Sequence, residues 1–126
     1  EAREWLERWG LAEYSSRLVT ELSYGEQRRL EILLAMAQQP RILLLDEPTS
    51  GMSPAETQET AQIIQGLPRS MALLVVEHDM DVVFSIADRI TVLHHGRVVA
   101  RGSCDEIRND PRVAEIYFGG GALRRA

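Results

Sequence analysis

Two apolar runs of the sequence, residues 42–45 and 71–76, are followed by side chains whose types suit phosphate chemistry. Asp46 and Glu47 come directly after the first run, and His78 closely follows the second. An aspartate at the end of a buried strand can hold Mg²⁺ for a nucleoside triphosphate, and a neighbouring glutamate can polarise an attacking water. His78 could hydrogen-bond a terminal phosphate. Each residue also has a simpler interpretation, as a turn residue or a polar strand terminus.

The stretch LSYGEQRRLEI, residues 22–32, contains a second group of this kind. Ser23 and Glu26 have the spacing of a capping box at the start of a helix. A capping box does not explain Gly25, because glycine weakens helices. A glycine in the first turn leaves the backbone N–H groups uncovered, so that an anion can approach the positive end of the helix. The stretch therefore fits either a plain cap or a phosphate cradle.

The elements that would position these residues follow a strand–helix–strand order. The two apolar runs lack alternation, which is typical of parallel strands buried on both faces. A helix over 26–39, closed by Pro40, precedes the first run, and a helix over 55–66, started by Pro54, separates the two. Ligands of such sheets bind at the carboxyl ends of the strands. The sequence predicts an α/β fold with a mostly parallel sheet flanked by helices.

The rest of the chain is predicted to form shorter elements. Turn residues His95 and Gly96 indicate a β-hairpin within 89–102, and the adjacent histidines lack partners at metal-ligand spacing. The tail after residue 118 is expected to be mobile. The other expected helical segments are 1–9, 11–21, 80–87, one that starts near 103, and 111–118.

Composition excludes several classes of protein. The net charge of −5 and the pI of about 5.2 argue against a nucleic-acid surface. The longest apolar runs are far shorter than the roughly 20 residues that span a bilayer. A single cysteine, Cys104, cannot form an internal disulfide, and this fits a reducing, cytosolic compartment.

The order LSYGEQRR, ILLLDEP, TSGMSP and VVEHD resembles the C-terminal half of an ABC transporter ATPase. These stretches correspond to its signature motif, Walker B motif, D-loop and switch histidine. Details such as ADRITVLHHGRVVARG and IRNDPRVAEIYFG look most like the ATP-binding subunits of branched-chain amino-acid uptake systems. The resemblance implies a P-loop NTPase fold that ends in a β-hairpin and short helices.

The resemblance also implies roles for individual residues, with ATP and Mg²⁺ as the ligands. Asp46 would orient the Mg²⁺ shell, Glu47 would act on the attacking water, and His78 would sense the γ-phosphate. The signature residues would contact ATP held by the opposite subunit of a head-to-tail dimer, and the D-loop would cross the dimer interface. The signature residues are Ser23, Tyr24, Gly25 and Glu26, and the D-loop residues are Ser50, Gly51, Met52 and Ser53. Tyr24, Glu26 and Ser53 depart from the commonest family pattern.

The resemblance divides the chain into three parts of a partial nucleotide-binding domain. Residues 1–39 would end the helical subdomain, 40–102 would form the core from the Walker B motif to the switch histidine, and 103–126 would form C-terminal helices and a tail. The Walker A half is expected to lie upstream, because the 126 residues contain no lysine. We therefore expect the chain alone neither to bind ATP tightly nor to hydrolyse it. Without the neighbouring strand, the sheet is expected to expose an edge and apolar faces.

The implied whole protein would energise amino-acid import from the cytoplasmic face of the cell membrane. Its expected partners are a second ATP-binding subunit, membrane permease subunits and, indirectly, a periplasmic or extracellular solute-binding protein, with no nucleic acid. Two alternatives stay open at this point. The chain could come from another ABC system, such as urea uptake or lipopolysaccharide export, or it could be a non-catalytic module that supplies the signature surface to a partner ATPase.

Overall fold

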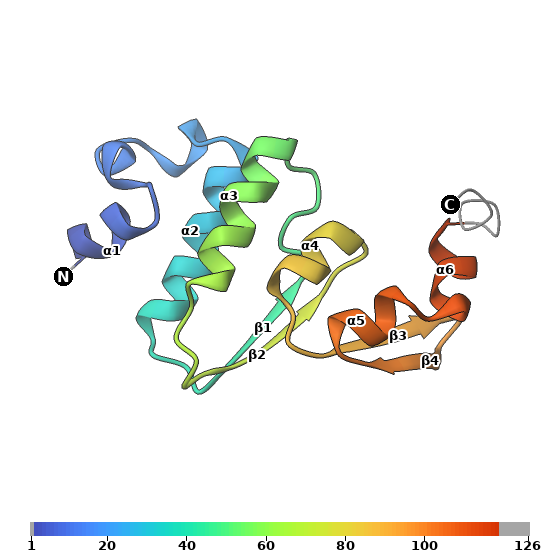
Figure 1. Cartoon of the computed structure of the whole chain (residues 1–126). Coiled ribbons are helices and arrows are strands. Elements are labelled where there is room, and N and C mark those ends of the chain that lie inside the picture. Colours follow the sequence, from blue (N-terminus) through green and yellow to red (C-terminus); the bar gives the residue numbers. More distant parts are fainter. Residues whose placement is uncertain (1, 119–126) are drawn as a thin grey trace. The chain divides into compact units, whose positions relative to one another are not determined.

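The computed structural model describes residues 2–118 of the chain, and the predicted mobile tail lies outside this range. The described residues form two compact units that divide between Ile86 and Ala87. Figure 1 shows the elements of both units in chain order. Each unit is described by itself below.

The first unit places two long helices against a pair of parallel strands. Its elements are α1 (Ala2–Arg8), the 3-10 helices η1 (Ala12–Tyr14) and η2 (Val19–Glu21), α2 (Tyr24–Ala37), β1 (Ile42–Asp46), α3 (Pro54–Gln65), β2 (Ala72–Val76) and α4 (Met80–Ile86). Strands β1 and β2 pair in parallel, with Ile42 opposite Ala72 and Asp46 opposite Val76. This confirms the predicted strand–helix–strand order.

The segment 11–21 differs from the single helical piece that the sequence predicts. It contains two isolated 3-10 turns, η1 and η2, with Ser15 and Ser16 between them. Serine side chains compete for backbone hydrogen bonds and favour turns over helix interiors. The preceding helix α1 ends before Gly10, which has φ +65°.

Local capping residues fix where the long helices begin. The side chain of Ser23 accepts a hydrogen bond from Glu26 N–H, and Glu26 accepts one from Ser23 N–H at 2.7 Å. Helix α3 begins with the same box formed by Ser53 and Glu56, and Pro54 is its first residue. A proline costs nothing there, since the N–H it lacks has no partner within the helix.

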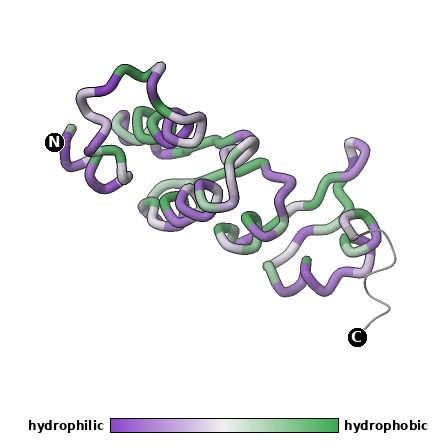
Figure 2. Tube along the Cα trace, turned by 90° about the horizontal axis from the view of Figure 1, so that it is seen from above, coloured by the Kyte–Doolittle hydropathy of each residue, from purple (hydrophilic) through white to green (hydrophobic). Residues whose placement is uncertain are grey.

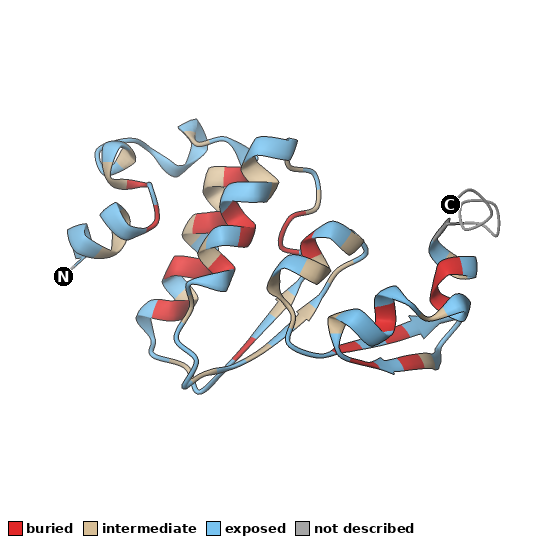
Figure 3. Ribbon diagram, in the orientation of Figure 1, coloured by how far each residue is buried: buried red, intermediate tan, exposed pale blue. Residues whose placement is uncertain are grey.

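The core of the first unit lies between α2, the α1–η1 segment and one face of the strands. Hydrophobic residues recur along α2 and α3 between hydrophilic ones (Figure 2), and the buried residues gather along these helices (Figure 3). Arg29, only 8% exposed, forms an ion pair with Glu59 at 2.9 Å and so joins α2 to α3. The buried core residues are Trp9, Leu11, Ile32, Leu33, Met36 and Leu43.

The two strands are buried on one face only, so the burial on both faces that the apolar runs predict for a complete sheet is not reached in the described chain. Leu43 is 6% exposed, whereas its neighbours Ile42 and Leu44 are 64% and 68% exposed. On β2, Leu74 and Val76 are exposed as well. The alternation arises because the helices of the first unit cover one side of the pair and no described element of that unit covers the other. This agrees with the expectation of exposed apolar faces, and the four residues are called the open strand face below.

The second unit is a β-hairpin packed against two short helices. Strands β3 (Ile90–His94) and β4 (Arg97–Gly102) pair in an antiparallel manner, with a register irregularity between Val92 and Leu93. The turn residues His95 and Gly96 both have positive φ, which gives the twist that tight hairpins prefer. Helices α5 (Cys104–Arg108) and α6 (Pro111–Phe118) pack on β4. The predicted hairpin and its turn are therefore confirmed.

Candidate functional site

Two of the residues singled out at the strand ends lie in contact. Glu47 follows β1 with φ +45°, a left-handed conformation that is uncommon for a residue with a side chain. Its N–H donates to the carbonyl of Val76 at 2.8 Å, which extends the strand pairing by one step. As a result, Glu47 Oε1 lies 3.4 Å from Nδ1 of His78 just beyond β2. Both side chains are exposed, so they are open to a ligand.

Asp46 is joined to the signature helix through its backbone. Nη2 of Arg28, on α2, donates to the Asp46 carbonyl oxygen at 3.0 Å. The Asp46 carboxylate is left free of this bond, and the residue is exposed at the last position of β1. The contact fixes the first turns of α2 beside the strand end where Glu47 and His78 meet.

A glutamate that the sequence analysis did not single out anchors the loop after β1. Glu77 Oε1 accepts hydrogen bonds from the N–H and the hydroxyl of Thr49, at 3.0 and 2.7 Å. Thr49 is 6% exposed, so its polar groups depend on this partner. The signal in the sequence was the glutamate directly before His78, at a strand end. Its partner could not be predicted, because the two residues are far apart along the chain.

The N-terminus of α2 meets the N-terminus of α3. Ser23 Oγ donates to Glu56 Oε1 at 3.1 Å, and Gly25 is buried beside the same carboxylate. A Cβ built on Gly25 would lie 2.6 Å from Glu56 Oε1, far inside van der Waals contact. Glu56 was not singled out from the sequence, although its spacing from Ser53 is that of a capping box.

Tyr24 of the signature stretch and Gly51 of the D-loop also lie together. A Cβ built on Gly51 would lie 3.5 Å from Cε1 of Tyr24, so the tyrosine ring packs over this glycine. Gly51 has φ +76°, which glycine adopts without strain. Met52 contacts the fully buried Thr60 through its sulfur, at 3.3 Å from Oγ1. The structure thus brings residues 23–25 next to residues 50–53, which lie on a separate part of the chain.

Hydrogen bonds shift the titration of the groups around this helix end. The backbone N–H of Ser23 is the main cause that lowers the pKa of Glu26, and the backbone N–H of Ser53 likewise lowers the pKa of Glu56. A hydrogen bond to Glu26, with desolvation as the next cause, raises the pKa of Tyr14 to about 12. With their pKa values lowered, Glu26 and Glu56 are both ionised at neutral pH.

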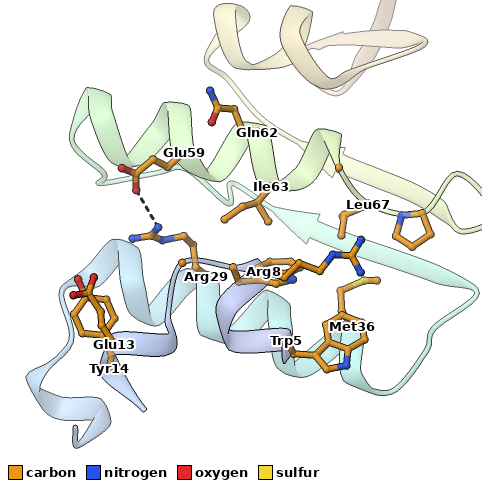
Figure 4. A pocket seen from close by; sticks show the side chains of 14 residues that line it. Trp5, Arg8, Glu13, Tyr14, Arg29, Met36, Glu59, Gln62, Ile63 and Leu67 are labelled. Carbon is orange, nitrogen blue, oxygen red and sulfur yellow. Dashed lines mark hydrogen bonds and ion pairs between the residues drawn. The ribbon is translucent and has the colours of Figure 1, made fainter. Parts of the chain in front are cut away.

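A separate cavity of about 640 Å³ lies in the first unit between α1, η1, α2 and α3 (Figure 4). The Arg29–Glu59 ion pair is drawn at its wall, and Nε of Arg29 is buried without a hydrogen-bond partner. None of the strand-end, signature or D-loop residues lines it. The lining residues named in Figure 4 are Trp5, Arg8, Glu13, Tyr14, Arg29, Met36, Glu59, Gln62, Ile63 and Leu67.

Residues 2–118 contain no cluster of three histidine, cysteine or acidic side chains that could hold a metal ion. A lone carboxylate such as Asp46 still suits Mg²⁺, which keeps several waters and takes phosphate oxygens as ligands. Over the same range, no helix is long and apolar enough to cross a bilayer.

Comparisons with known proteins agree with the motif order. Residues 1–50 match the family model described as ABC transporter, and residues 97–122 match the one described as branched-chain amino acid ATP-binding cassette transporter. The fold agrees as well: MJ1267, an ATP-binding cassette of an ABC transporter, superposes in its ADP conformation with a TM-score of 0.81 at 32% identity, over 94% of this chain and 48% of that one. The chain belongs to the ABC transporter ATP-binding family.

Within this family, the similarity is to subunits of branched-chain amino-acid transporters. The high-affinity branched-chain amino acid transport ATP-binding protein LivG of Salmonella typhimurium is 47% identical over 120 residues, which are 94% of this chain and 47% of LivG. BraF of Pseudomonas aeruginosa, described in the same words, is 42% identical over equal shares. The lipopolysaccharide export protein LptB of Acidithiobacillus ferridurans is less similar, at 40% over 99 residues, 78% of this chain and 41% of LptB. The chain spans about half the length of the curated relatives it matches.

Proposed function

We propose that this chain is the signature-bearing part of the ATP-hydrolysing subunit of a branched-chain amino-acid importer. The observation that carries the proposal is the contact between Glu47 and His78, 3.4 Å apart at the carboxyl ends of two parallel strands. The similarity to LivG and BraF supports the choice of transport system over urea uptake and lipopolysaccharide export. The proposed subunit works at the cytoplasmic face of the membrane, with permease subunits and a solute-binding protein.

The proposed chemistry assigns one role to each strand-end residue. Glu47 accepts a hydrogen bond from the water that attacks the γ-phosphate and so orients it in line with the bond that breaks. His78 donates to an oxygen of the γ-phosphate and holds the neighbouring Glu47 side chain in place. Asp46 holds Mg²⁺ through its water shell. All three side chains are exposed, as contact with a ligand from outside the unit requires.

The signature residues are proposed to act on a second ATP. Ser23, Tyr24, Gly25 and Glu26 present the N–H groups and dipole of α2 to the γ-phosphate held by an opposite ATP-binding subunit. The D-loop, Ser50 to Ser53 with Gly51 and Met52, is proposed to cross the interface beside them. The packing of Tyr24 over Gly51 supports this, because it makes the two segments one surface.

The proposed division of the chain follows these roles. Residues 1–39 carry the end of the helical subdomain, 40–102 the catalytic core, and 103–126 the C-terminal helices and tail. None of the 126 residues is a lysine, so the β- and γ-phosphates must meet the phosphate-loop lysine elsewhere. The same fact keeps a second candidate open, in which the chain supplies only its signature surface to a complete ATPase.

Association with a complete relative tests the proposal. Purified LivG is mixed with the chain, and the complex is measured by sedimentation in MgATP and in MgADP. We expect a complex in MgATP that is weakened by Ser23→Ala and unaffected by Glu106→Gln, which alters a capping box in the other unit. Equal association with both nucleotides, or an unaltered complex with Ser23→Ala, would contradict the proposal.

A further inference from the structure

The N-terminus of α2 already has a carboxylate against it. Glu56 Oε1 accepts from Ser23 Oγ at 3.1 Å and fills the space beside Gly25, where a Cβ would come within 2.6 Å. Glu56 belongs to α3, so this carboxylate is not part of the local capping of α2, which Ser23 and Glu26 complete between themselves. It lies at the end of the helix to which the proposed function brings a phosphate.

The two oxygens of Glu56 have separate partners. Oε2 accepts from the N–H and the hydroxyl of Ser53, at 3.0 and 2.9 Å, and so completes the cap of α3. Oε1 contacts Ser23. A movement of the side chain that carries Oε1 away from Ser23 and leaves Oε2 at Ser53 would break the contact to α2 and keep the cap of α3. The hydrogen bond from Ser23 to Oε1 can therefore be lost without loss of the α3 cap.

We propose that Glu56 forms an autoinhibitory contact with the signature end of α2 and must leave Ser23 before a phosphate binds there. This inference rests on the proposed function of Ser23 and Gly25. Two anions cannot share one helix N-terminus at contact distance without mutual repulsion. Glu56 keeps its hydrogen bonds to Ser53 as it leaves Ser23, so the cap of α3 stays in place.

The close approach of Glu56 also explains why residue 25 is a glycine. The sequence analysis explains Gly25 by the approach of an anion from another chain. In the structure the anion that comes close is a carboxylate of the same chain, and any side chain at position 25 would displace it. The helix end thus accepts an internal anion in the state described here, and a phosphate would exchange with it.

Titration with sodium tripolyphosphate at constant ionic strength tests the inference. The chain is labelled with ¹⁵N-glycine, and the amide signal of Gly25 reports binding at the end of α2. Removal of one unit charge about 4 Å from an anion in water changes its affinity roughly fivefold. We expect Glu56→Gln to lower the half-saturating concentration by this factor. Glu106→Gln is the matched control, because Glu106 caps α5 of the second unit in the same way.

The outcomes separate this inference from the proposed function. Equal half-saturation for the unaltered chain and Glu56→Gln would overturn the autoinhibitory contact while leaving phosphate binding at Gly25 intact. Absence of any shift at Gly25 in either protein would contradict the proposed function itself, and the inference with it. The amide of Gly66, at the far end of α3, shows in each variant whether the helix remains folded.

Discussion

Replacement of Gly25 by alanine should reveal the contact between the two helix ends, because its effect on stability should depend on whether the Glu56 side chain is present. In a helix, alanine is favoured over glycine by up to about 1 kcal/mol. Against this, the new Cβ would lie 2.6 Å from Oε1, 2.8 Å from Cδ and 3.2 Å from Cγ of Glu56. These atoms are the movable end of a side chain, so relief of the overlap costs mainly the hydrogen bond to Ser23, roughly 0.5–1.5 kcal/mol. Gly25→Ala is therefore expected to change the free energy of unfolding by no more than about 0.5 kcal/mol in either direction.

Without the glutamate side chain, the same substitution should stabilise. In the Glu56→Ala background the clash is gone and only the helix preference remains, so Gly25→Ala should raise the free energy of unfolding by up to about 1 kcal/mol. The difference between the two backgrounds is an interaction energy of roughly 0.5–1.5 kcal/mol. Gly66→Ala, at the C-cap of α3, is the control, because a Cβ there meets nothing closer than 3.5 Å.

Urea denaturation followed by tryptophan fluorescence measures this cycle. Both tryptophans, Trp5 and Trp9, belong to the first unit, and Trp9 is buried in its core. The signal therefore reports the unfolding of the unit that contains both helix ends. If Gly25→Ala changed the free energy of unfolding equally in both backgrounds, the close approach of Glu56 to Gly25 would be refuted.

Three further predictions concern other parts of the molecule. Glu77→Ala should lower the free energy of unfolding by about 1–3 kcal/mol, because it leaves buried polar groups of Thr49 without a partner. Glu77→Gln should lower it less, and equal losses for the two variants in urea denaturation would argue against the hydrogen bonds. A hydrogen bond from Arg112 lowers the pKa of Asp110 to about 2. The ionised Asp110 should therefore stabilise the fold above its unfolded pKa of about 3.9, and this stabilisation should be lost as the pH falls towards 2. A pKa near 4 for Asp110 in an NMR titration would contradict this. The open strand face should cause concentration-dependent association that Leu44→Glu reduces, and sedimentation of an unaltered monomer at all concentrations would exclude it.

Much of the fold could be predicted because local patterns determine it. The capping serine Ser23 with Glu26, Pro54 at a helix start, and the turn at His95 and Gly96 all act within a few residues, and the structure has each of them. The apolar runs likewise form the parallel strands they predict. In the caps and the turn, the partners lie close together along the chain. The strands are different, because Ile42 pairs with the distant Ala72, and only the apolar character of each run is local.

The contacts that build the candidate site could not be predicted in this way. Glu56 meets Ser23, and Glu77 meets Thr49, across long stretches of sequence that only tertiary packing brings together. Burial of the strands on one face only depends on which elements cover them, and the apolar runs do not encode this. The segment 11–21 follows the turn preference of its serines and not the helical periodicity.

The central claim is that the N-terminus of α2 faces the γ-phosphate of ATP in an opposite subunit. It is tested most directly with MnATP bound to LivG, because the paramagnetic ion broadens nearby amide signals of the ¹⁵N-glycine chain. Gly66 is the internal reference, since the 12-residue α3 sets it about 18 Å from the Ser53 end. Strong loss of the Gly25 signal with MnATP, and little loss at Gly66, is the result expected. A Gly25 signal that keeps its intensity, or that falls no more than that of Gly66, would contradict the claim.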